Sequence, residues 1–397
     1  MSTARTTRSW RVLTIVLVGL AMLASCGGGV DSGGTGAPAA YASGPITGFG
    51  SVIVNGVRFD DSAASILDDD GGTLTSAQLK LGMMIRIDAS AVTSTSGQPA
   101  ATAFVIRIGS AIVGTVDAID LTTNTLTVLG QSVYVTPATV FDTGLPGGLN
   151  GVTAGTTIEV FGQYDAAAHR YVATRIAPIA NPAAYKLRGI VTAVDTVAKT
   201  LTMGGLTISY ATNAQNALPN LVAGSLVRAR LGLTPTAGVW TAIELSSADA
   251  AIPDHRGSEV FGRISAWTSS HQFSLDGVPV DASAATFPQG ESGVVLGARV
   301  QVDGTTSLGV LRASTVTVEG DEDKANSDFE LHGAIESVNS LSQTLSVREV
   351  TVHYSAQTQF QSGAISDIAA GRTIKVTGVL SSDGNRIEAQ TIVFDSN

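Results

Sequence analysis

The chain has 397 residues, with 23 lysines and arginines against 33 aspartates and glutamates, giving a formal net charge of −10. An acidic protein repels nucleic acid, because such binding depends on phosphate contacts from lysine and arginine, so we expect no nucleic-acid partner. The 44 glycines and the aromatic content of only 5% favour short strands joined by tight turns. The single cysteine excludes an intramolecular disulfide.

Residues 1–25 have the layout of a bacterial export signal. Three arginines precede a mostly apolar run from Val12 to Leu23, which is too short to span a bilayer comfortably. The run ends in Leu-Ala-Ser-Cys26, which resembles the lipoprotein signal whose cysteine is lipidated and becomes the new N-terminus. We therefore predict a lipoprotein signal peptide over 1–25 and lipidation of Cys26. The alternative is a free thiol after an ordinary signal peptide.

The predicted anchor places the protein in the bacterial cell envelope, held on a membrane without spanning it. Several acyl chains anchor a protein far more firmly than one. Gly27 stands where the inner-membrane retention signal of enteric bacteria has aspartate, so by that resemblance the outer membrane is favoured, with the protein periplasmic or surface-exposed. Residues 26–43 are rich in glycine and predict a flexible tether.

A short pattern recurs five times after the tether. In each copy an aliphatic residue stands three positions before a glycine, and apolar residues stand three and five positions after it, which predicts a turn feeding a half-buried strand. A glycine fixed at that point predicts a positive φ or a position too crowded for a Cβ. The five glycines are Gly82, Gly155, Gly224, Gly297 and Gly371, spaced by 73, 69, 73 and 74 residues.

This spacing predicts an all-β protein, a tandem array of about five small domains of five short strands each. A turn glycine also recurs in the first half of most copies, but the fifth has Glu349 there, and the first copy has a shortened first hairpin. Two proline-containing stretches, 177–185 and 248–257, predict semi-rigid hinges, and the charged stretch 319–328 predicts a solvated linker. We predict the β repeats at 44–110, 111–180, 185–248, 257–320 and 328–397.

The leader, the glycine-rich tether, the opening Gly44-Pro-Ile-Thr-Gly-Phe-Gly and the repeated Leu-x-x-Gly-x-x-Val units resemble a family catalogued as domain of unknown function 5666. These are tandem repeats in proteobacterial envelope proteins, and the resemblance covers Gly44 to the C-terminus. It implies a small OB-like barrel, and it brings no activity and no site residues. Five strands with a longer third connection are independently compatible with such a closed barrel.

The sequence shows no constellation of catalytic residues, so we predict a non-enzyme without cofactors. No pair of histidines has metal spacing, and we interpret the five as isolated surface or turn residues. Asp254 and His255 form the only close acid and base pair in the sequence, without a nucleophile motif. The acidic stretches 68–70 and 321–323 lack calcium-loop spacing and are interpreted as solvated loops. The histidines are His169, His255, His271, His332 and His353.

Two functions stay open. The favoured one is a non-catalytic envelope lipoprotein, a modular scaffold or binding protein whose partner is another envelope protein. The alternative is a cell-surface glycan-binding or glycan-processing protein, since OB-like barrels bind oligosaccharides and stack aromatic side chains on them. Trp240 and Trp267, beside predicted hairpin turns, are the weak candidates for ligand contacts.

Overall fold

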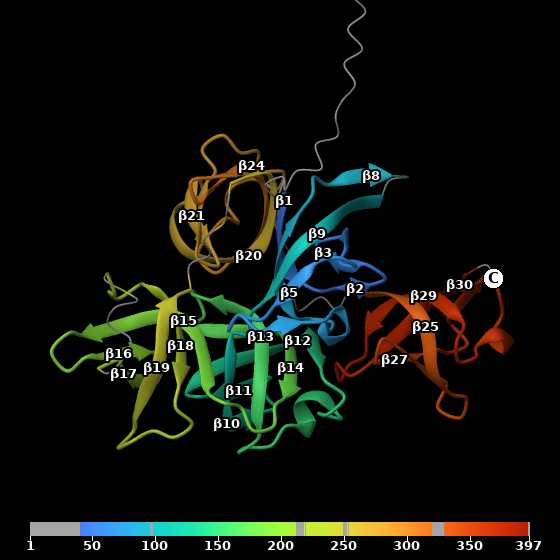
Figure 1. Ribbon diagram of the computed structural model, residues 1–397, viewed down its shortest axis with the longest axis horizontal. Coiled ribbons are helices and arrows are strands. Elements are labelled where there is room, and N and C mark those ends of the chain that lie inside the picture. Colours follow the sequence, from blue (N-terminus) through green and yellow to red (C-terminus); the bar gives the residue numbers. More distant parts are fainter. Residues whose placement is uncertain are drawn as a thin grey trace, which may run out of the picture. The chain divides into compact units, whose positions relative to one another are not determined.

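The computed structural model describes residues 40–95, 98–211, 218, 220–248, 252, 254–319 and 329–395 (Figure 1). Regular structure in these residues consists of β-strands and three short 3-10 helices, so the all-β prediction is confirmed. No helix within the described ranges is long and apolar enough to cross a membrane. The predicted signal peptide 1–25 and Cys26 lie outside the described residues.

Residues 112–178 form a closed five-stranded barrel. Its strands are β10 (Ile112–Asp120), β11 (Thr125–Val128), β12 (Gln131–Phe141), β13 (Thr157–Asp165) and β14 (Arg170–Pro178), with the helix η2 (Gly148–Gly151) between β12 and β13. Antiparallel pairs join β10 to β11, β11 to β12, β14 to β13 and β13 to β10. The parallel pair of β12 with β14 closes the circuit. No strand edge of this circuit is left open, which suits a small all-β unit.

The same five pairings recur in each of the three strand sets that follow along the chain. The first strand pairs with the second, and the second pairs with the third. The third strand pairs in parallel with the fifth, the fifth pairs with the fourth, and the fourth pairs with the first. The strands are β15 (Tyr185–Asp195), β16 (Thr200–Met203), β17 (Leu206–Ser209), β18 (Leu226–Leu231) and β19 (Val239–Ser247); β20 (His255–Ser269), β21 (Gln272–Leu275), β22 (Val278–Asp281), β23 (Arg299–Ser307) and β24 (Val310–Val318); and β25 (Phe329–Asn339), β26 (Thr344–Val347), β27 (Val350–His353), β28 (Gln359–Gln361), η3 (Ile365–Asp367), β29 (Thr373–Leu380) and β30 (Ile387–Phe394).

The first part of the described chain is the least regular. Its first strand is split into β1 and β2, and the β2–β3 hairpin keeps a single residue pair, Gly48 with Ile53, so the predicted shortened hairpin is confirmed. Its elements are β1 (Ala40–Pro45), β2 (Gly48–Phe49), β3 (Val52–Val54), β4 (Val57–Asp60), β5 (Ser65–Leu67), β6 (Thr73–Leu74), η1 (Ser76–Gln78), β7 (Met84–Ala89), β8 (Thr93–Thr95) and β9 (Gln98–Ile108).

The predicted tether 26–43 is wrong at its C-terminal end. Strand β1 begins at Ala40, and its first three residues are buried. They pair with β7 on one side and with β20 on the other. The glycine content that suggested a tether ends before this point, but the short Ala-Tyr-Ala stretch has too few residues to show a strand by periodicity.

The five recurrent glycines occupy one structural position. Each has a positive φ, between 77° and 92°, as predicted. The N–H of each donates to the carbonyl oxygen of an apolar residue in or beside the first strand, at 2.8 to 2.9 Å. This bond fixes the start of the fourth strand against the first. The apolar residues three and five positions later are buried in every copy, so the predicted core face is confirmed.

Strand pairs also join parts of the chain that are far apart in sequence. Strand β1 pairs in parallel with β20, β2 pairs in parallel with β25, and β10 pairs with β15. One hydrophobic cluster runs through residues 111–245. The predicted hinge 177–185 is therefore wrong, because the strands on either side of it share this cluster. The predicted hinge 248–257 is wrong at its end, since His255 already lies in β20. The stretch 320–328 lies outside the described residues.

Candidate functional site

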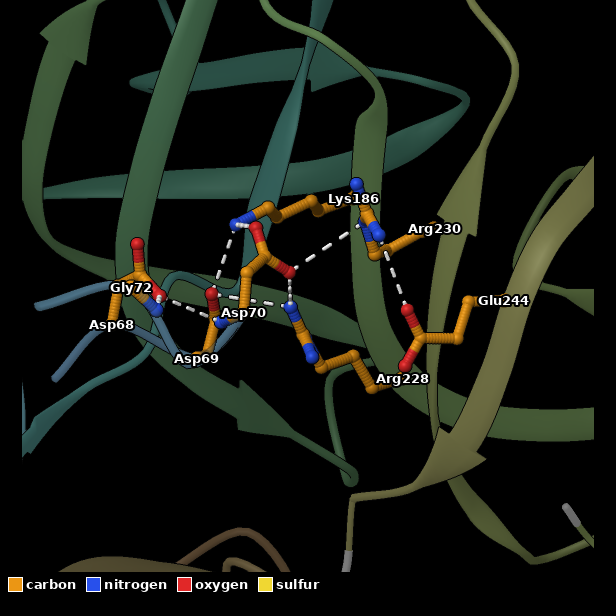
Figure 2. Close-up of polar contacts among 8 residues, drawn as sticks. All are labelled: Asp68, Asp69, Asp70, Gly72, Lys186, Arg228, Arg230 and Glu244. Carbon is orange, nitrogen blue, oxygen red and sulfur yellow. Dashed lines mark hydrogen bonds and ion pairs between the residues drawn. The ribbon is translucent and has the colours of Figure 1, made fainter.

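The acidic stretch Asp68-Asp69-Asp70 forms a tight loop between β5 and β6. The backbone N–H groups of Asp70 and Gly72 donate to Asp68 Oδ1 at 2.9 and 2.6 Å. Gly71, with φ of 84°, completes the turn. Asp68 is thus used to shape the loop, and the carboxylates of the next two residues are presented outward (Figure 2).

Four basic side chains face this loop region from β15 and β18. Lys186 lies opposite Arg230 in the antiparallel register, and Arg188 lies opposite Arg228. Directly opposed and alternate residues share one face of a sheet, so all four lie on the outer face of the strands. The inner face carries Leu187, Val227 and Ala229, which are fully buried.

Asp69 and Asp70 form a network of ion pairs with this basic face (Figure 2). Lys186 Nζ lies 2.9 Å from Asp69 Oδ1 and 2.5 Å from Asp70 Oδ2, and Arg228 contacts both carboxylates. Arg230 Nε approaches Asp70 Oδ1 at 3.6 Å. The side chain of Asp69 is only 12% exposed. The interpretation of 68–70 as a solvated loop is therefore wrong for Asp69, which pairs with Lys186, 117 residues away, whereas Asp70 remains exposed.

The network favours the charged forms of Asp70 and Lys186. Burial opposes ionisation of Asp70, but the hydrogen bonds and charges of Lys186 and Arg228 outweigh it and lower the pKa of that carboxyl. Burial likewise disfavours the Lys186 ammonium, and the two aspartates outweigh it and raise the pKa of Lys186. Groups held this way do not exchange protons near neutral pH. The arrangement fastens the loop to β15 and β18.

A cavity of about 400 Å³ lies beside the network. Its lining comes from segments of the chain that are distant in sequence and includes Arg86 of β7, Arg107 of β9, and Arg188 and Arg228 of the basic face. Asp276, in the β21–β22 turn, also lines it. A cavity of this size is typical of sites for small molecules.

The two tryptophans have different surroundings. Trp240, on β19, packs on the hydrophobic cluster, and its ring centroid lies 5.7 Å from that of Tyr185. Trp267, on β20, is 46% exposed, and its Nε1 donates to the carbonyl oxygen of Val294 at 2.8 Å. The structure does not bring them together in one site. Trp267 is the one with an accessible ring face.

The interpretation of the five histidines as isolated surface or turn residues is wrong for His255. His169 occupies a turn, with φ of 53°. His255, however, is only 3% exposed, and its Nε2 lies 3.4 Å from Asp88 of β7. Asp254, its neighbour in the sequence, accepts the backbone N–H of Leu308 with Oδ1 at 2.6 Å. The other three histidines each lie beside a carboxylate: His271 beside Glu291, His332 beside Asp395 and His353 beside Glu388.

Sequence analysis also missed a pair of carboxylates on neighbouring strands. Glu259 of β20 lies directly opposite Asp303 of β23. Burial, together with the charge of Asp303, raises the pKa of Glu259 to about 7. The residues are 44 positions apart, and only the strand register reveals their pairing. Within the described residues, no three His, Cys, Asp or Glu side chains gather closely enough to hold a metal ion.

Three segments of the chain match one protein family, described as Domain of unknown function (DUF5666): residues 113–177, 261–317 and 332–392. Each matched segment lies inside one of the predicted repeats 111–180, 257–320 and 328–397. No curated protein matches the chain.

Proposed function

Because this chain is a repeat-containing DUF5666 protein, we propose that it is a non-catalytic lipoprotein of the bacterial cell envelope that acts as a modular scaffold or binding protein. The observation that carries the proposal is the role of the recurrent residues. The five recurrent glycines supply a backbone turn, and the apolar residues after them are buried. The residues that the repeats share thus determine the fold. The outer surfaces of the repeats can therefore differ from one another and bind partners.

The five repeats 44–110, 111–180, 185–248, 257–320 and 328–397 form an array of five OB-like barrels in this proposal. Support comes from the recurrent pairing order, in which the third strand meets the fifth in parallel and the fourth returns to the first. A fragment of residues 111–248 would contain the whole of the hydrophobic cluster that the second and third repeats share. We expect it to unfold cooperatively and to give a far-UV circular dichroism spectrum dominated by β structure. A helix content above about a third would contradict the barrels.

Lipidation of Cys26 would hold the protein on a membrane, with the outer membrane favoured by Gly27. The test is Cys26→Ser, which we expect to leave the protein soluble in the periplasm with an unprocessed or differently processed leader. Cys26→Ala provides a second variant without a nucleophilic side chain. A variant that still sediments with membranes after a high-salt wash would count against the lipid anchor.

The partner in this proposal is another envelope protein. Hairpin tips carry strongly exposed aliphatic side chains, Val197 at 92% and Leu341 at 98%, which are accessible to a partner protein. A photo-crosslinking residue placed at either position in living cells should yield a discrete adduct with an envelope protein. The same residue at buried Ile208 of β17 is the matched control. Turnover of a substrate by the purified mature chain would refute the non-catalytic proposal.

The exposure of Trp267 favours one alternative, a glycan-binding or glycan-processing protein of the cell surface. If that alternative holds, Trp267→Ala abolishes retention of the protein on bacterial cell-wall glycan with little loss of stability, because the ring is half exposed. Trp240→Ala, at a packed position, lowers stability in either case and serves as the comparison. Equal retention of the Trp267→Ala variant and the wild type would remove the alternative.

A further inference from the structure

The cavity beside the acidic loop has an unusual set of charges for an acidic protein. Two rows of side chains on outer strand faces contribute to it. In the first, Ser43 of β1 lies opposite Arg86 of β7, which lies opposite Arg107 of β9. In the second, Arg188 of β15 lies opposite Arg228 of β18. Four guanidinium groups therefore line one cavity of about 400 Å³.

Two of the four arginines have carboxylate partners. Arg107 Nη1 lies 2.6 Å from Asp88 Oδ2, and Arg228 contacts Asp69 and Asp70. These two charges are offset within the protein. The Arg107 side chain is also 44% exposed, whereas that of Arg228 is 15% exposed and depends on its partners.

The other two arginines lack such partners. Arg188 Nη2 donates to the backbone carbonyl oxygens of Asp276 and Ala248, at 2.9 and 3.3 Å, which satisfies hydrogen bonds but leaves its charge in place. In the described part of the chain, no carboxylate lies within ion-pair distance of Arg86. Burial lowers the pKa of Arg188, the charge of Asp276 opposes this, and the positive charge of Arg86 lowers the pKa further.

The carboxylate near Arg188 is Asp276, which also interacts with other groups. Asp276 Oδ2 accepts a hydrogen bond from Gln163 Nε2 at 2.9 Å. Burial raises the pKa of Asp276 to about 6, although Arg188 and Arg263 act to lower it. Four arginines line the cavity against three carboxylates, those of Asp68, Asp69 and Asp276. An anion bound beside Arg86 would offset the positive charge that these carboxylates leave.

The rest of the lining indicates the class of anion. Guanidinium groups bind carboxylate and phosphate oxygens through two parallel hydrogen bonds. Burial raises the pKa of Tyr41 to about 12, so its hydroxyl stays protonated and able to donate. Met84, Leu275 and Val278 add an apolar wall. We propose that this cavity binds a small organic anion, with its carboxylate or phosphate group between Arg86 and Arg188 and its apolar part against this wall. The proposal does not depend on the scaffold function above.

The test is isothermal titration of the purified mature protein with hexanoate and with inorganic phosphate, at an ionic strength kept constant with sodium chloride. Hexanoate carries both the charge and an apolar chain, and phosphate carries the charge alone. We expect saturable binding of at least one of them to the wild type. Arg86→Gln breaks no ion pair and should fold, and it should weaken binding about tenfold or more, since it removes a charged hydrogen-bond donor.

Two further variants separate this proposal from a structural role. Asp276→Asn removes the carboxylate near Arg188, which is ionised above about pH 6, so at pH values above this it should tighten anion binding while Arg86→Gln weakens it. Arg256→Gln, at an exposed arginine of β20, is the matched control and should leave binding unchanged. Failure of the wild type to bind either anion would overturn the proposal. So would equal affinities of the wild type and the Arg86→Gln variant, or an Arg256→Gln variant as weak as Arg86→Gln.

Discussion

At the scale of single residues, the recurrent glycines show that backbone conformation alone can require a residue type. At Gly224 φ is +92°, and a Cβ there would meet nothing within 4 Å. Glycine is therefore needed at this position because of the positive φ, and not because a side chain would clash with neighbouring atoms. L-residues with a side chain adopt this region at a cost of about 1–2 kcal/mol.

We expect Gly224→Ala to lower the free energy of unfolding by about 1–2 kcal/mol for this reason. The control is Gly232→Ala, at a position that is equally open but has no left-handed φ. There alanine should be neutral or slightly stabilising, because it reduces the entropy of the unfolded chain. Urea denaturation of both variants decides the matter, and equal losses at the two positions would contradict the conformational explanation.

Asp276 gives a prediction of pH dependence at the same scale. Its pKa is about 6 in the folded protein, against 3.8 as the ordinary value, because it is buried. The folded state therefore binds a proton that the unfolded state has lost, so the contribution of this group to stability is complete below pH 4 and is lost as the pH rises through about 6.

Asp276→Asn cannot ionise, and asparagine tolerates the local φ of 47°. We expect the variant to gain stability relative to the wild type as the pH is raised from about 4 to about 7. Denaturant unfolding at several pH values measures this difference. A difference that does not change with pH would show that Asp276 is not protonated in the folded protein.

At the scale of elements, a bulged residue in the first strand accepts a hydrogen bond from the turn between the second and third strands. The register of β10 shifts at Asp117, and Asp117 Oδ2 accepts the N–H of Gly130 in that turn at 2.8 Å. Ser265 of β20 accepts the N–H of Gly277 in the same way, at 3.0 Å. Bulges increase the local bend of a strand, which a small closed barrel needs. Here the bulged residue also satisfies a turn amide.

The equivalent turn before β27 has the same geometry without glycine. Arg348 and Glu349 have φ of 52° and 61°, and the N–H of Glu349 donates to Glu336 Oε2 at 3.0 Å. A turn with two positive φ values favours glycine at its second position. The side chain of Glu349 pairs with Lys80 at 2.7 Å but is 73% exposed, so this pair stabilises little.

We therefore expect Glu349→Gly to raise the free energy of unfolding by about 1 kcal/mol, by relieving the left-handed conformation. Glu349→Ala loses the same ion pair and keeps the strained conformation, so it should be neutral or slightly destabilising. Thermal unfolding of the two variants distinguishes them. Equal melting temperatures would mean that the turn conformation stores no measurable strain.

At the scale of the whole molecule, contacts between distant segments make the repeats interdependent. Strand β1 lies between β7 and β20, and β2 pairs with β25, so residues near the N-terminus depend on the C-terminal part of the chain. The ion pairs of Asp69 and Asp70 with Lys186 and Arg228 add a second link. Strand edges that lose a partner become templates for association.

Deletion of residues 260–397 leaves only residues 255–259 of β20 and removes its partner β23. The outer edge of β1 is then poorly covered, so we expect a β-rich protein that self-associates. Deletion of residues 329–397 alone keeps β20 and removes only the short pairing of β2, so that variant should stay monomeric. Size-exclusion chromatography with light scattering compares them. If the 1–259 chain were monomeric and amide exchange in β1 were unchanged, β1 would not depend on the C-terminal part of the chain.

The sequence by itself determined the interior of each repeat. The turn glycines, the buried residues three and five positions later, and the meander of short strands follow from patterns within about 70 residues. Periodicity and the allowed φ of glycine act over that range, so these features could be predicted. Even there, the start of β1 at Ala40 was not apparent, because the short Ala-Tyr-Ala stretch shows no periodicity.

Only the tertiary structure decided which surfaces meet. Lys186, Arg188, Arg228 and Arg230 alternate with buried core residues exactly as solvent-facing residues do, so alternation cannot tell a solvated side chain from one that pairs with Asp69 or faces a cavity. The pairing of Asp69 with Lys186 spans 117 residues, and that of Ala40 with Gly257 a longer distance still. Such contacts depend on how the outer faces of distant strands pack together. The local pattern of buried and exposed residues does not indicate which of these faces meet.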